Sequence, residues 1–263
     1  MAYGKCKLCL QDKILQDSHL MPKALYEKIR APDSAPTFIN SAVMVQTNKQ
    51  LRHHLLCFEC EQLLNGGGES WLLPLVATPD GKFPFFDILT SVPPFFSWKD
   101  KAIYAAIDNP RIDVDKLVHF ALGIFWKASV HGWHGQPDNL IEIGPYSDAI
   151  RAFLLGKSAF PSNIALTLYV IPPHAVPYEF QPPYRGKRTQ YYSYFFYLLG
   201  LVFWLSVGKM IGESKDEFLY PSLTHPITVE DLSESVKNNT FSMIRTAKKT
   251  EKVKKYLAKK RDS

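Results

Sequence analysis

The sequence predicts an α+β fold in which a small N-terminal module precedes a larger mixed domain. Two observations carry this prediction. All four cysteines lie in two CxxC pairs near the N-terminus, and the rest of the chain alternates between helix-like apolar spacing and runs of aromatic and β-branched residues. With 46% apolar residues, the chain can bury a sizeable core. The expected boundaries are 1–72 for the module, 73–244 for the α+β domain and 245–263 for a basic tail.

The positive charge of the chain is concentrated in this tail. The formal net charge is +6, and residues 245–263 hold nine Lys or Arg and two acids, a net +7 that leaves −1 for residues 1–244. The body of the protein is therefore nearly neutral. Binding to a polyanion such as DNA is expected from the tail or from a local patch rather than from the overall charge.

Several segments of the larger domain have a clear pattern. Apolar residues at three- and four-residue spacing predict a helix over 113–131. A second helix is predicted over 145–155, with Pro145 in its first turn and Gly156 just past its end. A run of aliphatic and aromatic residues predicts a strand over 163–171. Residues 228–260 are interpreted as helical, and the Pro-rich residues 71–110 as a connector without a long helix.

Residues 191–208 carry no charge and have the length of a membrane-spanning helix. Their aromatic and β-branched content, with Gly200 near the middle, favours two buried strands joined near Leu199 and Gly200. We therefore expect no stable membrane insertion, with a membrane-associated protein as the alternative. Three further glycines, 66–68, predict the end of a helix, and a phosphate-binding loop is less favoured because no Lys-Ser/Thr pair follows.

The two CxxC pairs are the strongest chemical signal in the chain. Two such turns place four thiolates around one tetrahedral zinc, and four protein ligands leave no open position, so the zinc would be structural. The alternative is a chance pairing of buried cysteines. No secretory signal is visible at the N-terminus, and a reducing cytoplasmic location is expected. The ligands would be Cys6, Cys9, Cys57 and Cys60.

Polar residues lie between and just after these pairs. The segment SHLMPK contains Ser18, His19 and Lys23, and Glu61 directly follows the second pair. Taken alone, His19 is most simply interpreted as a histidine that caps a turn, because single histidines are rarely catalytic.

The order CxxC, SHxxPK and LLCxxCE resembles that of HNH endonucleases with four zinc-binding cysteines. The resemblance implies a treble-clef ββα module, with His19 as the general base and Glu61 as a second catalytic residue. It also implies a divalent ion such as Mg²⁺ held by Glu61, with Asp17 or Ser18. The chain departs from the family pattern at Ser18, a poor Mg²⁺ ligand, and at Arg52, where the family usually has an asparagine.

The function implied by the resemblance is metal-dependent hydrolysis of DNA phosphodiester bonds, in bacterial defence or in a mobile element. The alternative is a catalytically inactive zinc module that binds nucleic acid or a protein partner. In both cases DNA contact would come from exposed basic groups of the module and tail. The residues expected to contact DNA are Lys23, His54, Lys248, Lys249, Lys252, Lys254 and Lys255.

Overall fold

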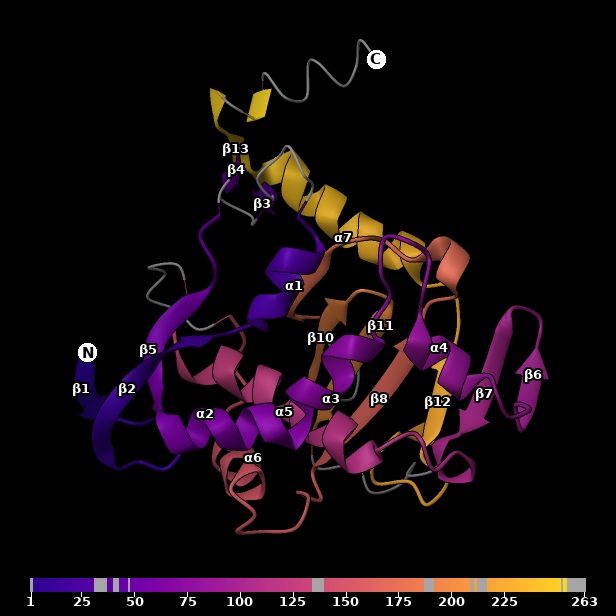
Figure 1. Ribbon diagram of the computed structural model, residues 1–263, viewed down its shortest axis with the longest axis horizontal. Helices are drawn as coiled ribbons and strands as arrows, with labels where there is room; N and C mark the ends of the chain where they lie inside the picture. Colours follow the sequence, from indigo (N-terminus) through magenta and orange to yellow (C-terminus); the bar gives the residue numbers. More distant parts are fainter. Residues whose placement is uncertain are drawn as a thin grey trace.

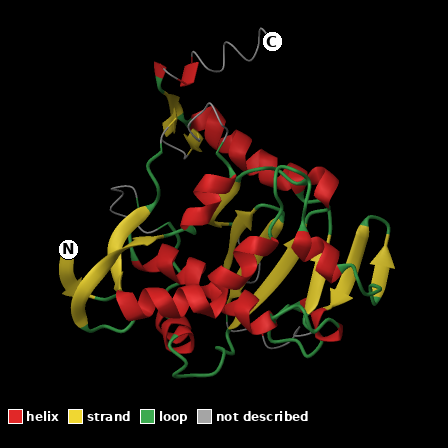
Figure 2. Ribbon diagram, viewed as in Figure 1, coloured by secondary structure: helices red, strands yellow, loops and turns green. Residues whose placement is uncertain are grey.

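The computed structural model confirms an α+β fold, with helices and three sheets (Figure 1, Figure 2). Its buried residues form one continuous main core that extends from Cys6 in the N-terminal module to Val236 near the C-terminus. The division of the chain at residue 72 stays a prediction. The structure describes residues 2–30, 37–39, 43–46, 48–133, 140–186, 192–208, 211, 217–251 and 253–254.

The N-terminal module is built on a three-stranded antiparallel sheet in the order β1-β2-β5. These strands are β1 (Ala2–Lys5), β2 (Asp12–His19) and β5 (Arg52–Cys57), and helix α2 (Phe58–Leu64) begins directly after β5. The segment between β2 and β5 is an insertion that leaves the sheet. It contains α1 (Lys23–Lys28), β3 (Thr37–Ile39) and β4 (Val43–Gln46).

The glycines after α2 interrupt the helical path, as predicted: α2 ends at Leu64, and Gly68 has the non-helical angles φ 168° and ψ −29°, which form a kink between two helices. A π-helical turn, η1 (Asn65–Glu69), continues into α3 (Ser70–Leu72) and a 3-10 turn, η2 (Leu73–Leu75). The physical reason is packing against a neighbouring helix, because a β-carbon at Gly68 would lie 2.2 Å from the carbonyl oxygen of Lys116. Glycine here permits a close approach of two backbones at the kink between the two helices.

Helix α5 (Val114–Val130) is the central element of the molecule, and the predicted helix over 113–131 is confirmed. The Asp113 carboxylate caps it by accepting a hydrogen bond from the Lys116 N–H at 3.0 Å. One side of α5 packs on α2 and η1, and another packs aromatic rings such as Phe125 onto Phe196 of the large sheet. The second predicted helix is present as α6 (Tyr146–Leu154).

The large sheet has seven strands in the order β6-β7-β12-β8-β11-β10-β9. All neighbours are antiparallel except β12 and β8, which are parallel. Helix α4 (Pro84–Leu89) and the short turns η3 (Ala106–Asp108) and η4 (Pro173–Ala175) connect its parts. The strands are β6 (Phe96–Trp98), β7 (Lys101–Ala105), β8 (Ile164–Val170), β9 (Phe180–Arg185), β10 (Tyr192–Leu198), β11 (Leu201–Val207) and β12 (Pro226–Val229).

The uncharged segment forms the β10–β11 hairpin, which confirms the two-strand interpretation. Its turn residues, Leu199 and Gly200, have φ values of 39° and 97°, as a tight hairpin turn requires. Nearly all side chains of both strands are buried, on both faces of the sheet, which explains why this segment carries no charge. Among the described residues, no helix is long and apolar enough to cross a membrane.

The C-terminal part corrects the helix predicted over 228–260. Its first residues belong to β12, whose Ile227 and Val229 enter the core, and the helix observed is α7 (Ser233–Thr246). After α7 the chain forms a short strand, β13 (Lys248–Lys249), which pairs in parallel with β4 of the insertion. The N-terminal module and the C-terminal segment therefore share a sheet in the order β13-β4-β3 (Figure 1).

Candidate metal centre and histidine site

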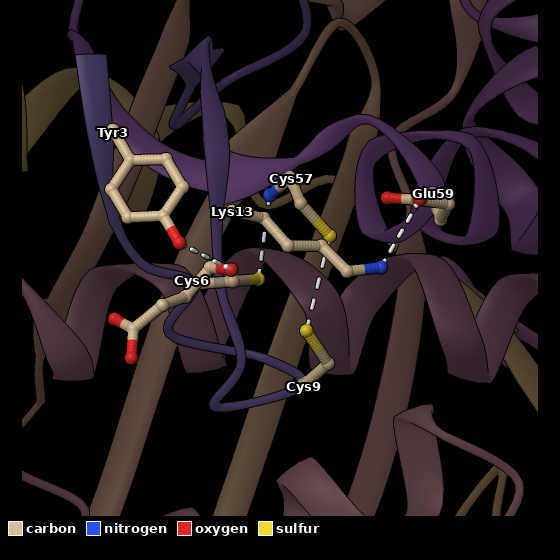
Figure 3. A network of polar contacts seen from close by, with 7 residues as sticks. Tyr3, Cys6, Cys9, Lys13, Cys57 and Glu59 are labelled. Carbon is tan, nitrogen blue, oxygen red and sulfur yellow. Dashed lines mark hydrogen bonds and ion pairs between the residues drawn. The ribbon is translucent and has the colours of Figure 1, made fainter.

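The four cysteines meet at one point of the N-terminal module. Cys6 follows β1, Cys9 lies in the turn before β2, Cys57 ends β5, and Cys60 lies in the first turn of α2. All four sulfur atoms lie within 4.8 Å of one another. The Sγ atoms of Cys9 and Cys57, which are 3.8 Å apart, face each other in Figure 3. A tetrahedron with Zn–S bonds of about 2.3 Å separates its sulfurs by about 3.8 Å. The cluster therefore has the ligand set and spacing of a four-thiolate zinc site.

The backbone around the cluster is shaped to hold sulfur. The Cys57 N–H donates to the Cys6 Sγ at 3.3 Å, and the Leu10 N–H donates to the Cys6 carbonyl at 2.9 Å. The hydrogen bond from Cys60 lowers the pKa of Cys6 to about 4, whereas burial raises the pKa of Cys57 to about 11. Without a cation, the Cys6 thiolate is thus favoured, whereas a second thiolate beside it is disfavoured.

Exposed groups flank the cluster. The Lys13 ammonium and the Glu59 carboxylate form an ion pair at 3.1 Å beside the sulfurs (Figure 3). This pair links β2 to α2 on the surface of the module. Exposed pairs of this kind add little stability.

His19 ends β2 and is held at two points. Its Nε2 lies 2.6 Å from the Oε1 of Gln50, and its carbonyl oxygen accepts a hydrogen bond from the Lys127 ammonium at 2.7 Å. With the Gln50 oxygen as acceptor, the neutral imidazole carries its proton on Nε2 and its lone pair on Nδ1. The ring is half-buried, so it retains access to solvent.

Buried charges surround the backbone of His19. Lys127, on α5, is 5% exposed, and burial lowers the pKa of its ammonium while the carboxylates of Glu69 and Glu61 oppose that shift. Burial raises the pKa of Glu69, against the opposing effect of the nearby Lys127. Glu61 Oε1 is buried, with no hydrogen-bond partner among the described residues. Glu69 interacts electrostatically with both His19 and Glu61, which places the four residues in one cluster.

The other residues expected to bind a divalent ion have different partners. Ser18 is buried beside the register shift between β2 and β5, which falls at Gln16 and Asp17; its hydroxyl donates to the Gln16 carbonyl at 3.4 Å and accepts from the Leu56 N–H at 3.2 Å. The Asp17 carboxylate forms an ion pair with Arg52 at 2.8 Å. In the described part of the chain, the four cysteines are the one group with three or more clustered metal ligands. These contacts do not support ion binding by Ser18 or Asp17, which stays a prediction.

The residues expected to contact DNA lie in two places. Lys23 begins α1, and His54 lies on β5; both are exposed. In the C-terminal segment, Lys249 donates to the Ile244 carbonyl at 2.9 Å and Lys254 pairs with Glu251 at 2.6 Å. Lys248 is exposed on β13, whereas Lys252 and Lys255 lie outside the described residues.

Three residues of the histidine site were not found from the sequence. They are Gln50, Glu69 and Lys127. Gln50 lies in the insertion, and Glu69 follows the glycines interpreted as a helix end. Lys127 lies in the buried second half of α5, and a single charge among its apolar residues was a signal that could have identified it, because buried charges are rare unless they have partners.

Comparison with known proteins adds no family to this description. No protein-family model matches the chain, and neither does any curated protein or any solved structure.

Proposed function

We propose that the chain is a zinc-stabilised HNH-type endonuclease that hydrolyses phosphodiester bonds in DNA, with His19 as the general base. The observation that supports this proposal most strongly is the orientation of His19 by Gln50, with Glu61 and Glu69 in the same charged cluster. The order of the CxxC, SHxxPK and LLCxxCE motifs supports the same class of protein.

The proposed reaction uses the free ring nitrogen of His19. The Gln50 contact leaves the lone pair on Nδ1, which takes a proton from a water molecule. The water oxygen attacks phosphorus, and the bond from phosphorus to one ester oxygen breaks. Gln50 and Lys127 hold the ring and the backbone of His19, so the base does not have to be ordered when DNA binds.

The experiment is incubation of purified protein with plasmid and linear DNA, with and without added Mg²⁺ or Mn²⁺. His19→Ala should abolish cleavage and leave DNA binding unchanged. His174→Ala is the matched control, because His174 is exposed and lies in η4, within the larger domain. Equal cleavage by the wild type and His19→Ala contradicts the proposal.

A second candidate function is a zinc module that binds nucleic acid or a protein partner without catalysis. The Asp17–Arg52 ion pair and the two backbone bonds of Ser18 favour it, because they occupy the groups that would bind a divalent ion. DNA binding without cleavage under any metal condition supports this second function.

A further inference from the structure

Lys127 is an unusual residue for a helix core. It lies on the buried central helix α5 and is 5% exposed, and its ammonium donates a hydrogen bond to the main-chain oxygen of His19 at 2.7 Å. A buried ammonium is unstable unless other groups compensate its charge. The compensating groups are the carboxylates of Glu61 and Glu69, both of which interact with it electrostatically.

Of these carboxylates, Glu69 interacts electrostatically with His19 and with Glu61. Asp17 is paired with Arg52 at 2.8 Å, and the Ser18 hydroxyl is engaged with two backbone groups of β2 and β5. A divalent ion at this site would therefore depend on Glu61, whose Oε1 is buried without a described partner.

We infer that the Lys127 ammonium supplies the positive charge of the histidine site that a divalent ion would otherwise supply. Lys127 offsets the negative charge of Glu61 and Glu69 while it anchors the end of β2. The inference concerns the site of the proposed function, but it is a statement about metal binding and does not depend on DNA cleavage.

Electrostatics favours the ammonium over an added ion. A divalent cation at Glu61 would lie near a fixed positive charge in a region of low dielectric constant, where repulsion is far stronger than in water. The Lys127 side chain cannot easily move away, because it is buried on α5 and its ammonium donates a hydrogen bond to the His19 carbonyl oxygen. One of the two negative charges of the site is thus offset by a side chain of α5, which follows the N-terminal module in the sequence.

The test is a titration of the zinc-loaded protein with Mn²⁺, followed by the electron paramagnetic resonance signal of free Mn²⁺. The wild type should show no saturable Mn²⁺ binding at Glu61, so Glu61→Gln should give the same titration as the wild type. Lys127→Met should gain a Mn²⁺ site. The affinity of this variant for Mn²⁺ should exceed the affinity of the wild type by roughly a hundredfold, because a positive charge has been removed beside two carboxylates. Lys127→Arg should remain like the wild type. Lys116→Met on the same helix is the matched control, because the Lys116 ammonium pairs with Asp113 at 3.1 Å.

Two results would overturn the inference. One is saturable Mn²⁺ binding by the wild type that is lost in Glu61→Gln. This comparison does not use a Lys127 variant, so it tests the inference even if Lys127→Met fails to fold. The other is a folded Lys127→Met that gains no Mn²⁺ binding. Absence of DNA cleavage refutes the proposed nuclease but leaves the outcome of this titration unchanged.

Discussion

The backbone of Gly68 lies against that of Lys116, so closely that a β-carbon at Gly68 would stand 2.2 Å from the Lys116 carbonyl oxygen. The φ angle of Gly68 is 168°, an extended value open to any residue, so the contact rather than the dihedral requires glycine. This approach sets the distance between the helical path of the module and α5.

Gly68→Ala should therefore lower the free energy of unfolding by about 1–3 kcal/mol, because either backbone must move to admit the methyl group. Denaturant unfolding measures the change. Gly66→Ala is the matched control: nothing lies within 4 Å of a β-carbon there, and little loss is expected. Equal losses at the two positions would show that the close approach does not matter.

A second pair of glycines separates backbone strain from steric contact. Gly156 and Gly200 both have positive φ, 66° and 97°, but a β-carbon at Gly200 would meet the Phe83 ring at 2.6 Å, whereas Gly156 faces open space. Gly156→Ala should lose about 1–2 kcal/mol of stability from the left-handed backbone alone. Gly200→Ala should lose more, because Phe83 is buried and cannot move freely. Thermal unfolding that ranks them in the opposite order would contradict this account.

The cysteine cluster should hold about one zinc per chain, as elemental analysis of the purified protein would measure. Removing a ligand, as in Cys60→Ser, should release the zinc and destabilise the whole module, because zinc binding contributes to folding free energy. The surface variant Ser70→Ala should keep its zinc. A fully folded protein without metal would show that the four thiols only pack together.

Acid should destabilise the protein through His119. Burial lowers the pKa of His119 and outweighs the hydrogen bond to the Leu154 carbonyl at 3.2 Å. The unfolded chain, with an ordinary histidine pKa near 6.5, takes up the proton more readily than the folded chain. The free energy of unfolding should therefore fall as the pH drops below about 6.5. His119→Gln should flatten this dependence in denaturant titrations, and the exposed His174→Gln should leave it unchanged.

The part of the basic tail beyond Lys254 offers a clean test of DNA binding. Ala247 and Val253 are buried against Met44, so a deletion that begins at residue 245 would also damage the fold. A chain that ends at residue 254 keeps these contacts and loses four Lys or Arg. It should bind DNA more weakly, with a flatter salt dependence, because fewer counterions are released. An unchanged salt slope in filter-binding assays would remove the tail from the DNA-binding surface.

Elements with a strong local pattern could be predicted from the sequence. Helix α5 has apolar spacing and a capping Asp113, and the β10–β11 hairpin has two aromatic runs around Gly200. The cysteine spacing likewise predicted a cluster that the structure brings together. Each of these features is decided by neighbouring residues along the chain, or by the chemistry of a single residue type.

The remainder depends on contacts between distant segments. The sequence predicted a helix end at the glycines but not the contact of Gly68 with Lys116, because Lys116 is on another element. Residues of β12 were assigned to a helix, since a four-residue strand between two neighbours has too short a pattern to be seen alone. Lys127 became part of the histidine site only when α5 packed under β2. Tertiary contact, rather than local pattern, decides each of these features.

The pairing of β13 with β4 has a consequence for how the protein is made. The hairpin of β3 and β4 is synthesised early, but its third strand emerges only after every strand of the seven-stranded sheet. Until then β4 has an unpaired edge and an uncovered Met44, which are features that invite contact with other chains. Of the described sheets, the one formed by β13, β4 and β3 is therefore the last whose strands are all synthesised.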